Sequence, residues 1–167
     1  MSHINLWSPW RIDYILSPKE NSCIFCKKPT EKNDAENLIL HRGDFSFLIL
    51  NKFPYNSGHL MAVPYKHTCN FENLTKEELS EIDSLIKIAI RLLKKNMSPN
   101  GFNIGLNIGK AAGAGIDEHL HYHIVPRWEG DTNFMPVFAN TRVVPQSIQQ
   151  VYEIFKKDLR RMSLTKK

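Results

Sequence analysis

Three histidines alternate with apolar residues in the stretch HLHYHIV, residues 119–125. His119, His121 and His123 stand two apart, although the whole chain of 167 residues contains only seven histidines. In an extended strand the side chains of residues i, i+2 and i+4 point to one face, whereas a helix would spread them around its axis. The spacing therefore predicts a β-strand with three imidazoles in a row on one face.

A row of imidazoles favours chemistry over a purely structural role, because burying several imidazoles costs free energy unless each finds a partner. The functional alternatives are a metal site and a nucleophilic histidine supported by its neighbours. A neutral imidazole can attack phosphorus if its other nitrogen donates to a backbone carbonyl, because that bond fixes the tautomer. The neighbouring imidazoles can then supply protons or hydrogen bonds to phosphate oxygens.

The glycine-rich loop GKAAGAGIDE, residues 109–118, comes directly before these histidines. Glycines such as Gly113 and Gly115 let backbone N–H groups approach an anion closely, and Lys110 adds a positive charge. A flexible hairpin loop is the alternative interpretation. The position of the loop next to the histidines favours phosphate binding.

The remaining pattern predicts a single α+β domain over residues 1–167 with a largely antiparallel sheet. Short apolar runs predict strands that precede or pair with the histidine strand, at 37–41, 45–50, 59–63 and 102–108. The last of these is expected to form an antiparallel hairpin with the histidine strand. The polar segment 17–34, which holds a C-x-x-C pair, is expected to be a loop or knuckle.

Two main helices are expected. The first begins at a capping box formed by Thr75 and Glu78, and it should end before Ser98-Pro99 because the residue before a proline avoids helical angles. The second covers about 147–162, where apolar residues recur at helical spacing.

Composition excludes several classes of function. The 22 basic and 17 acidic residues give a net charge of +5, too small and too scattered to indicate nucleic-acid binding. No apolar run approaches a membrane span and the N-terminus lacks a signal-peptide pattern, so we expect a cytoplasmic protein with no membrane partner. Three cysteines are too few for a disulfide scaffold.

Cys23 and Cys26 form a C-x-x-C pair, which indicates metal binding or redox chemistry in a reducing compartment, unless the site is vestigial. Zinc would need two further nitrogen or sulfur ligands. His67 and His119 are candidates for these ligands.

The motif His119-Leu-His121-Tyr-His123-Ile-Val, with the glycine loop before it and Pro126-Arg127 after it, resembles that of the histidine-triad family. The resemblance covers about residues 23–128, with 1–22 and 129–167 as extensions, the second ending in a helix. It implies the histidine-triad fold, a homodimer, and nucleotide hydrolase or transferase activity.

The resemblance also implies residue roles. The middle histidine, His121, would attack the α-phosphorus to form a nucleotidyl-histidine, and His123 would contact the phosphates and help the leaving group. Nucleotide-binding positions are implied for a further set: Asn51 at the ribose, His59 beside the nucleotide, and Asn107, Gly113 and Gly115 near the phosphates. In zinc-containing members, positions corresponding to His67 and His119 complete a structural zinc site with the two cysteines.

Segments 6–14, 113–128 and 130–137 are similar to the diadenosine-tetraphosphate phosphorylase branch of the family. Dinucleoside polyphosphate hydrolases carry glutamine four residues before the first triad histidine, where this chain has Gly115. The resemblance thus implies an adenine nucleotide substrate, carrying Mg²⁺ on its polyphosphate, and phosphate as the second nucleophile. Alternatives are hydrolysis of dinucleoside polyphosphates or nucleoside phosphoramidates, a slow-turnover nucleotide-binding regulator, and a hydrolase with all three histidines on zinc.

Overall fold

The computed structural model describes residues 22–131 and 147–164. Its five-stranded sheet has the order β1-β2-β3-β5-β4, and every neighbouring pair is antiparallel. The strands are β1 (Ile39–Arg42), β2 (Ser46–Leu50), β3 (Leu60–Pro64), β4 (Gly101–Leu106) and β5 (Tyr122–Arg127). The predicted α+β class and the hairpin of β4 with β5 are confirmed. Within these two ranges no helix is long and apolar enough to cross a membrane.

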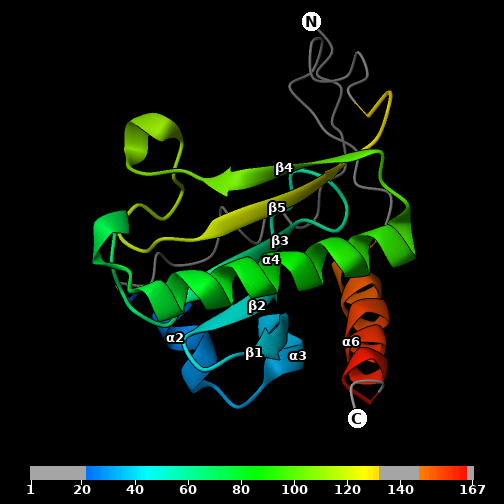
Figure 1. The fold of residues 1–167 in the computed structure, drawn as a ribbon, viewed down its shortest axis with the longest axis horizontal. Helices are drawn as coiled ribbons and strands as arrows, with labels where there is room; N and C mark the ends of the chain where they lie inside the picture. The colour runs from blue at the N-terminus through cyan, green and yellow to red at the C-terminus, as the bar shows by residue number, and fades with distance from the viewer. Residues whose placement is uncertain (1–21, 132–146, 165–167) are drawn as a thin grey trace, which may run out of the picture.

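Helix α4 (Lys76–Met97) lies across one face of the sheet and packs against β2, β3 and β5 (Figure 1). The predicted capping box is present. The Thr75 N–H donates to the Glu78 carboxylate at 2.7 Å, and the Glu78 N–H donates to Thr75 Oγ1 at 3.3 Å. The helix ends at Ser98, which has left-handed backbone angles and precedes Pro99. Its buried face completes the core with Ile82, Leu85, Ala89, Leu92 and Leu93.

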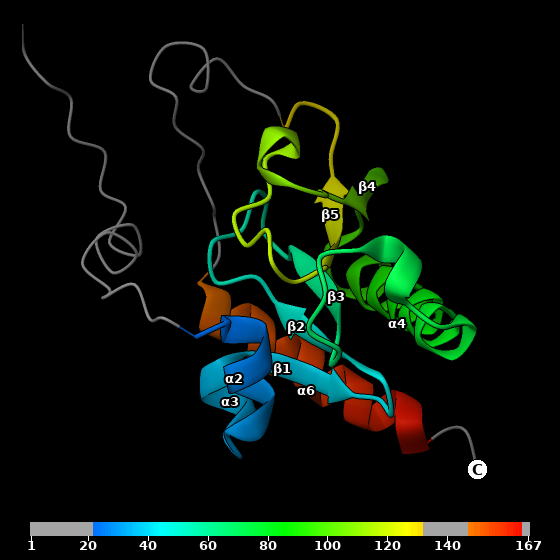
Figure 2. The same ribbon diagram turned by 90° about the vertical axis from the view of Figure 1, so that its left-hand side faces the viewer.

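Helix α6 (Ile148–Leu164) covers the outer edge of β1, and α3 (Asp34–Asn37) lies at the same side of the sheet (Figure 2). The Tyr152 hydroxyl donates to the Ile39 carbonyl at 3.2 Å. The Lys156 ammonium donates to the carbonyls of Ile39 and Leu40 at 3.1 and 3.0 Å. Backbone groups that an edge strand would leave open are therefore bonded to this helix.

The structure corrects the expected loop at 17–34. Within the described part of this segment, residues 24–30 form helix α2 (Ile24–Thr30), and α3 begins at Asp34. Cys23 starts the first turn, since its carbonyl accepts the N–H groups of Cys26 and Lys27 at 3.1 and 3.0 Å. Phe25 is buried and anchors this turn in the core, a tertiary contact that local polarity does not reveal.

The histidine strand is shorter than predicted, because β5 begins only at Tyr122. His119 and His121 come just before it, and the Leu120 N–H donates at 2.8 Å to the carbonyl of Thr68 instead of joining the sheet. The apolar face of residues 102–108 is also less buried than expected. Ile104 is 44% exposed, since helix α4 packs mainly against β2, β3 and β5, and Ile108 lies beyond the end of β4.

Candidate active site and metal centre

His121 is held in a single tautomer. Its Nδ1 lies 2.8 Å from the carbonyl oxygen of His119, which can only accept, so Nδ1 carries the proton. Nε2 is then left with a lone pair. Burial lowers the pKa of the imidazole, which favours the neutral form. This is the arrangement that a nucleophilic histidine requires.

His123 is held in the opposite tautomer by a series of hydrogen bonds that starts at the backbone N–H of Tyr55. The N–H of Tyr55 donates to Nδ1 of His59 at 3.1 Å, and the Asn51 side-chain amide lies 3.2 Å from the same nitrogen. Because Nδ1 of His59 accepts, its Nε2 carries the proton and donates to Nδ1 of His123 at 2.9 Å. His123 therefore keeps its own proton on Nε2. Burial, with the neighbouring imidazoles, lowers the pKa of His59 to about 3 and that of His123 to about 4.

The three imidazoles form one group. The rings of His121 and His123 lie 4.8 Å apart and meet edge to face, and those of His59 and His123 lie 5.0 Å apart. His59 is fully buried, so it stands behind His123. His121 offers a lone pair and His123 offers a proton, which is a pairing suited to attack on phosphorus with help to the leaving group.

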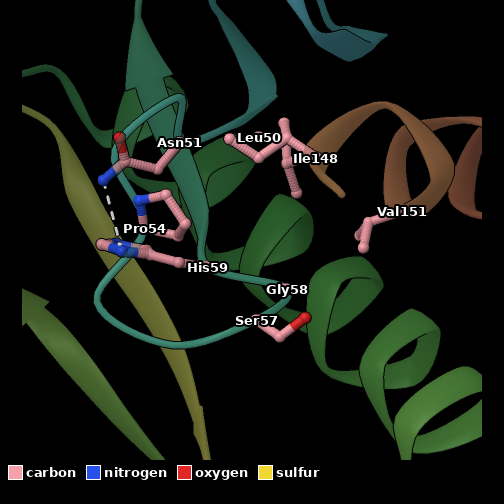
Figure 3. A pocket seen from close by; sticks show the side chains of 8 residues that line it. All are labelled: Leu50, Asn51, Pro54, Ser57, Gly58, His59, Ile148 and Val151. Atoms are coloured by element: carbon pink, nitrogen blue, oxygen red, sulfur yellow. Dashed lines mark hydrogen bonds between the residues drawn. The ribbon is translucent and has the colours of Figure 1, made fainter. Parts of the chain in front are cut away.

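The loop of residues 51–59 connects β2 to β3. Asn51 lies at its start and His59 at its end, and Figure 3 shows the two side chains close together. The Asn51 side-chain oxygen accepts the N–H of Phe53 at 3.0 Å, so the amide is oriented by its own loop. A small pocket lies beside this loop. Its lining is largely apolar and includes Ile148 and Val151 of α6, but neither His121 nor His123. We therefore place the reacting group outside it.

Cys23, Cys26, His67 and His119 are brought together as predicted, with one potential ligand atom of each lying within 4.8 Å of the others. The sulfurs of Cys23 and Cys26 lie 3.3 and 3.6 Å from His119 Nδ1, and His67 Nδ1 lies 3.3 Å from His119 Nδ1. Tetrahedral zinc would separate two nitrogens by about 3.4 Å, and a nitrogen and a sulfur by about 3.6 Å. The donor set and its spacing fit zinc.

The tautomer of His119 also fits a metal ligand. Its Nε2 donates to the Pro64 carbonyl at 2.9 Å, which leaves the Nδ1 lone pair facing the two sulfurs. A redox role for the cysteines is less suited, because burial and the neighbouring Cys23 raise the pKa of Cys26 to about 11, whereas reactive thiols have lowered values. Among the described residues this group is the one metal-ligand cluster of three or more such side chains, and it takes only His119 from the triad.

The connection between β4 and the histidines projects from the end of β4 (Figure 1). Asn107 begins it, and Gly109 and Gly113 have positive φ angles of 79° and 86° around the short helical turn Lys110–Ala112. A Cβ at Gly115 would meet nothing within 4 Å, so the space next to this position is open. The glycine loop is exposed and lies in the chain immediately before His119, as its role in binding phosphates would require.

Two residues that contact the site were not singled out from the sequence. Phe25, inside the C-x-x-C pair, has its ring 5.5 Å from that of His119 and 4.9 Å from that of His121. Tyr55 is 42% exposed, with its ring 4.7 Å from His59 and 5.6 Å from His123. The position of Phe25 between two candidate ligands was the signal available. Tyr55 follows a proline in a turn and gave no signal.

The HIT domain family model matches residues 32–130, which is more than half of the chain. The chain belongs to the HIT family. A Mycobacterium tuberculosis protein named AP-4-A phosphorylase is 40% identical over 152 residues, which are 86% of this chain and 78% of that protein. HIT family members are nucleotide hydrolases and transferases, and this chain is an enzyme of that kind. The family match starts after Cys26, so both cysteines lie outside it.

Solved structures of HIT proteins share the fold. A Zn-bound histidine triad family protein from Mycobacterium smegmatis superimposes with a TM-score of 0.68 at 22% identity, covering 87% of this chain and 98% of that one. A hypothetical histidine triad nucleotide-binding protein from Sulfolobus tokodaii gives a TM-score of 0.67 at 26% identity, with 84% and 94% covered. The predicted histidine-triad fold is therefore confirmed. The similarities predicted at 6–14, and at 130–137 beyond residue 131, lie outside the described residues.

Proposed function

We propose that this HIT enzyme cleaves diadenosine tetraphosphate with inorganic phosphate, giving ATP and ADP through a covalent adduct on His121. The observation that carries the proposal is the bond of His121 Nδ1–H to the His119 carbonyl, which leaves a nucleophilic lone pair on Nε2. Nε2 attacks the α-phosphorus of one AMP unit, the bond from that phosphorus to the bridging oxygen breaks, and ATP leaves. A phosphate oxygen then attacks the same phosphorus, ADP leaves, and Nε2 is free again.

His123 supports the departure of ATP. Its Nε2–H, fixed by the chain from Tyr55 through His59, is a donor for the bridging oxygen or a phosphate oxygen as negative charge develops there. His59 is then a positioning residue for His123. Proton donation of this kind contributes about 10²- to 10⁴-fold to a rate.

The nucleotide is held around this pair of histidines. Asn51 is proposed to bind the ribose, since its amide is already oriented by Phe53 and His59. Asn107, Gly113 and Gly115 are proposed to contact the phosphates of a substrate that carries Mg²⁺. The relatives that carry the name AP-4-A phosphorylase support an adenine nucleotide as substrate.

The choice of phosphate over water rests on Gly115. The open space at this position would admit inorganic phosphate where a glutamine side chain would stand in the hydrolases. The second candidate is a hydrolase of dinucleoside polyphosphates or nucleoside phosphoramidates, which would use the same first step and release AMP. A slow-turnover nucleotide-binding regulator is a third, but the present nucleophile geometry favours turnover.

We propose that Cys23, Cys26, His67 and His119 hold a structural zinc ion, which would tie α2 to the segments after β3 and before β5. Zinc supplies no reacting group in this scheme. We also propose a cytoplasmic homodimer. The exposed edge of β4, with Ile104 44% exposed, is suited to pairing with a second copy, and sedimentation equilibrium would measure the mass.

The test incubates the protein with diadenosine tetraphosphate and Mg²⁺, with and without inorganic phosphate. ATP and ADP should form only with phosphate, and AMP with ATP in both reactions would show hydrolysis instead. His121→Asn should abolish turnover and adduct formation while the nucleotide still binds. Turnover by this variant would refute the role of His121.

A further inference from the structure

Phe25 connects the metal cluster to the nucleophile by direct packing. It lies between Cys23 and Cys26 in the chain and is 2% exposed. Its ring meets the His119 ring edge to face, and it lies closer to His121, at a tilt of 41°. One side chain of the cysteine turn therefore touches both a candidate metal ligand and the imidazole proposed to attack phosphorus.

The backbone of His119 makes a second connection. Its Nδ1 faces the sulfurs, and its carbonyl oxygen accepts the hydrogen bond of His121 Nδ1–H, with a nitrogen–oxygen distance of 2.8 Å. The Leu120 N–H donates to the Thr68 carbonyl at 2.8 Å, which ties this backbone to the residue that follows His67. A shift of His119, or of the segment that carries His67, would therefore move the carbonyl that orients His121.

We propose that Phe25 is a positioning residue that makes the orientation of the His121 imidazole depend on the metal cluster. When four ligands share an ion, Cys23 and Cys26 fix the first turn of α2, and the Phe25 ring is held against His121. Without the ion, two thiols and two imidazoles have no common partner, and the Phe25 ring and the His119 carbonyl are then restrained only by core packing and by hydrogen bonds such as that of Leu120 to Thr68. The inference rests on the proposed role of His121 as nucleophile.

The kinetic test compares Phe25→Leu and Phe25→Met with wild type in the metal-loaded full chain. Small displacements of a reacting group reduce rates by up to about 10²-fold, so we expect kcat to fall about 10- to 100-fold with KM within about twofold and with unchanged metal content. Phe47→Leu is the matched control, because Phe47 is also buried but stacks on Tyr65, at 5.3 Å. It should keep kcat near wild type. An equal kcat loss in both would overturn the proposal.

A spectroscopic test reports orientation without turnover. In histidine-labelled, metal-loaded wild type the His121 Nδ1–H should give a resolved proton resonance that exchanges slowly with water. Phe25→Leu, Phe25→Met and chelated wild type should each show a shifted and faster-exchanging resonance. An unchanged resonance after chelation would overturn the proposal, even if a Phe25 variant failed to fold. If no adduct forms on His121 in wild type, the proposed function fails, whereas this resonance still decides the coupling.

Discussion

Replacing His59 should separate proton donation by His123 from nucleotide binding. His59 receives the Tyr55 N–H on Nδ1 and donates from Nε2 to His123, with nitrogen distances of 3.1 and 2.9 Å. In His59→Leu this donor is lost, so Nδ1 of His123 can carry the proton itself and leave Nε2 without one. His59→Gln keeps an amide that can accept from Tyr55 and donate to His123.

The size of the effect follows from one buried hydrogen bond. Leaving its partner unsatisfied costs about 1–3 kcal/mol, which corresponds to about a 5- to 150-fold loss in kcat if the whole cost falls on the transition state. The upper end of this loss meets the lower end of the range of about 10²- to 10⁴-fold for general acid catalysis, as expected if part of the proton donation by His123 is retained. We expect His59→Leu to show such a loss with KM within about twofold, and His59→Gln to keep most of the activity.

Acid stability gives an independent measurement on the same variant. Burial lowers the pKa of His59 from 6.5 to about 3, so between these values the unfolded chain binds a proton that the native chain does not. Native stability is therefore full above pH 6.5 and falls as the pH drops through this window, by up to about 1.4 kcal/mol per pH unit for this histidine. Urea unfolding should show a shallower pH dependence in His59→Leu. Wild-type kcat in His59→Leu, or equal kcat losses in the two variants, would refute the tautomer argument.

Three further predictions concern other parts of the molecule. Gly115→Gln should increase AMP release relative to ADP when phosphate is present, since the φ angle of Gly115 allows a side chain and the space next to it is open. A constant ratio of AMP to ADP would count against the role of this glycine. Glu81→Gln should lower the free energy of unfolding by about 1–3 kcal/mol, which urea unfolding would measure. The reason is that the Glu81 carboxylate accepts hydrogen bonds from the N–H groups of Asp44 and Phe45 and from the Ser46 hydroxyl. Chelation should lower the melting temperature by about 10 °C, with recovery on adding zinc, and an unchanged value would argue against a bound structural metal.

Local patterns predicted the regular elements well. The capping box of Thr75 and Glu78 located the start of α4, and Pro99 located its end, because both signals act within a few residues. The alternation of the histidines located β5 but not its first residue. His119 lies outside β5 because the N–H of its neighbour Leu120 donates to the carbonyl of Thr68 and not to a neighbouring strand. This hydrogen bond joins distant parts of the chain, so the local pattern could not predict it.

The composition of the site depended on contacts that no local pattern specifies. Cys23 lies 96 residues before His119, and His67 lies 52 residues before it, so only the resemblance to a family placed these three together. The helical turn after Cys23 and the burial of Phe25 also depend on the assembled core. The series of hydrogen bonds from Tyr55 to His123 could not be predicted from the sequence, because it begins at a backbone N–H, which does not depend on the residue type.

The bonds of Tyr152 and Lys156 to the carbonyls of Ile39 and Leu40 have a consequence for solubility. A sheet with two free edges can add copies of itself indefinitely, whereas a sheet with one free edge can only form a closed pair. By bonding to the carbonyls of β1, helix α6 opposes the addition of a strand at this edge, so the proposed pairing of two copies would use β4 and would end after two subunits. We therefore expect helix α6 to protect the protein from fibrous aggregation through β1.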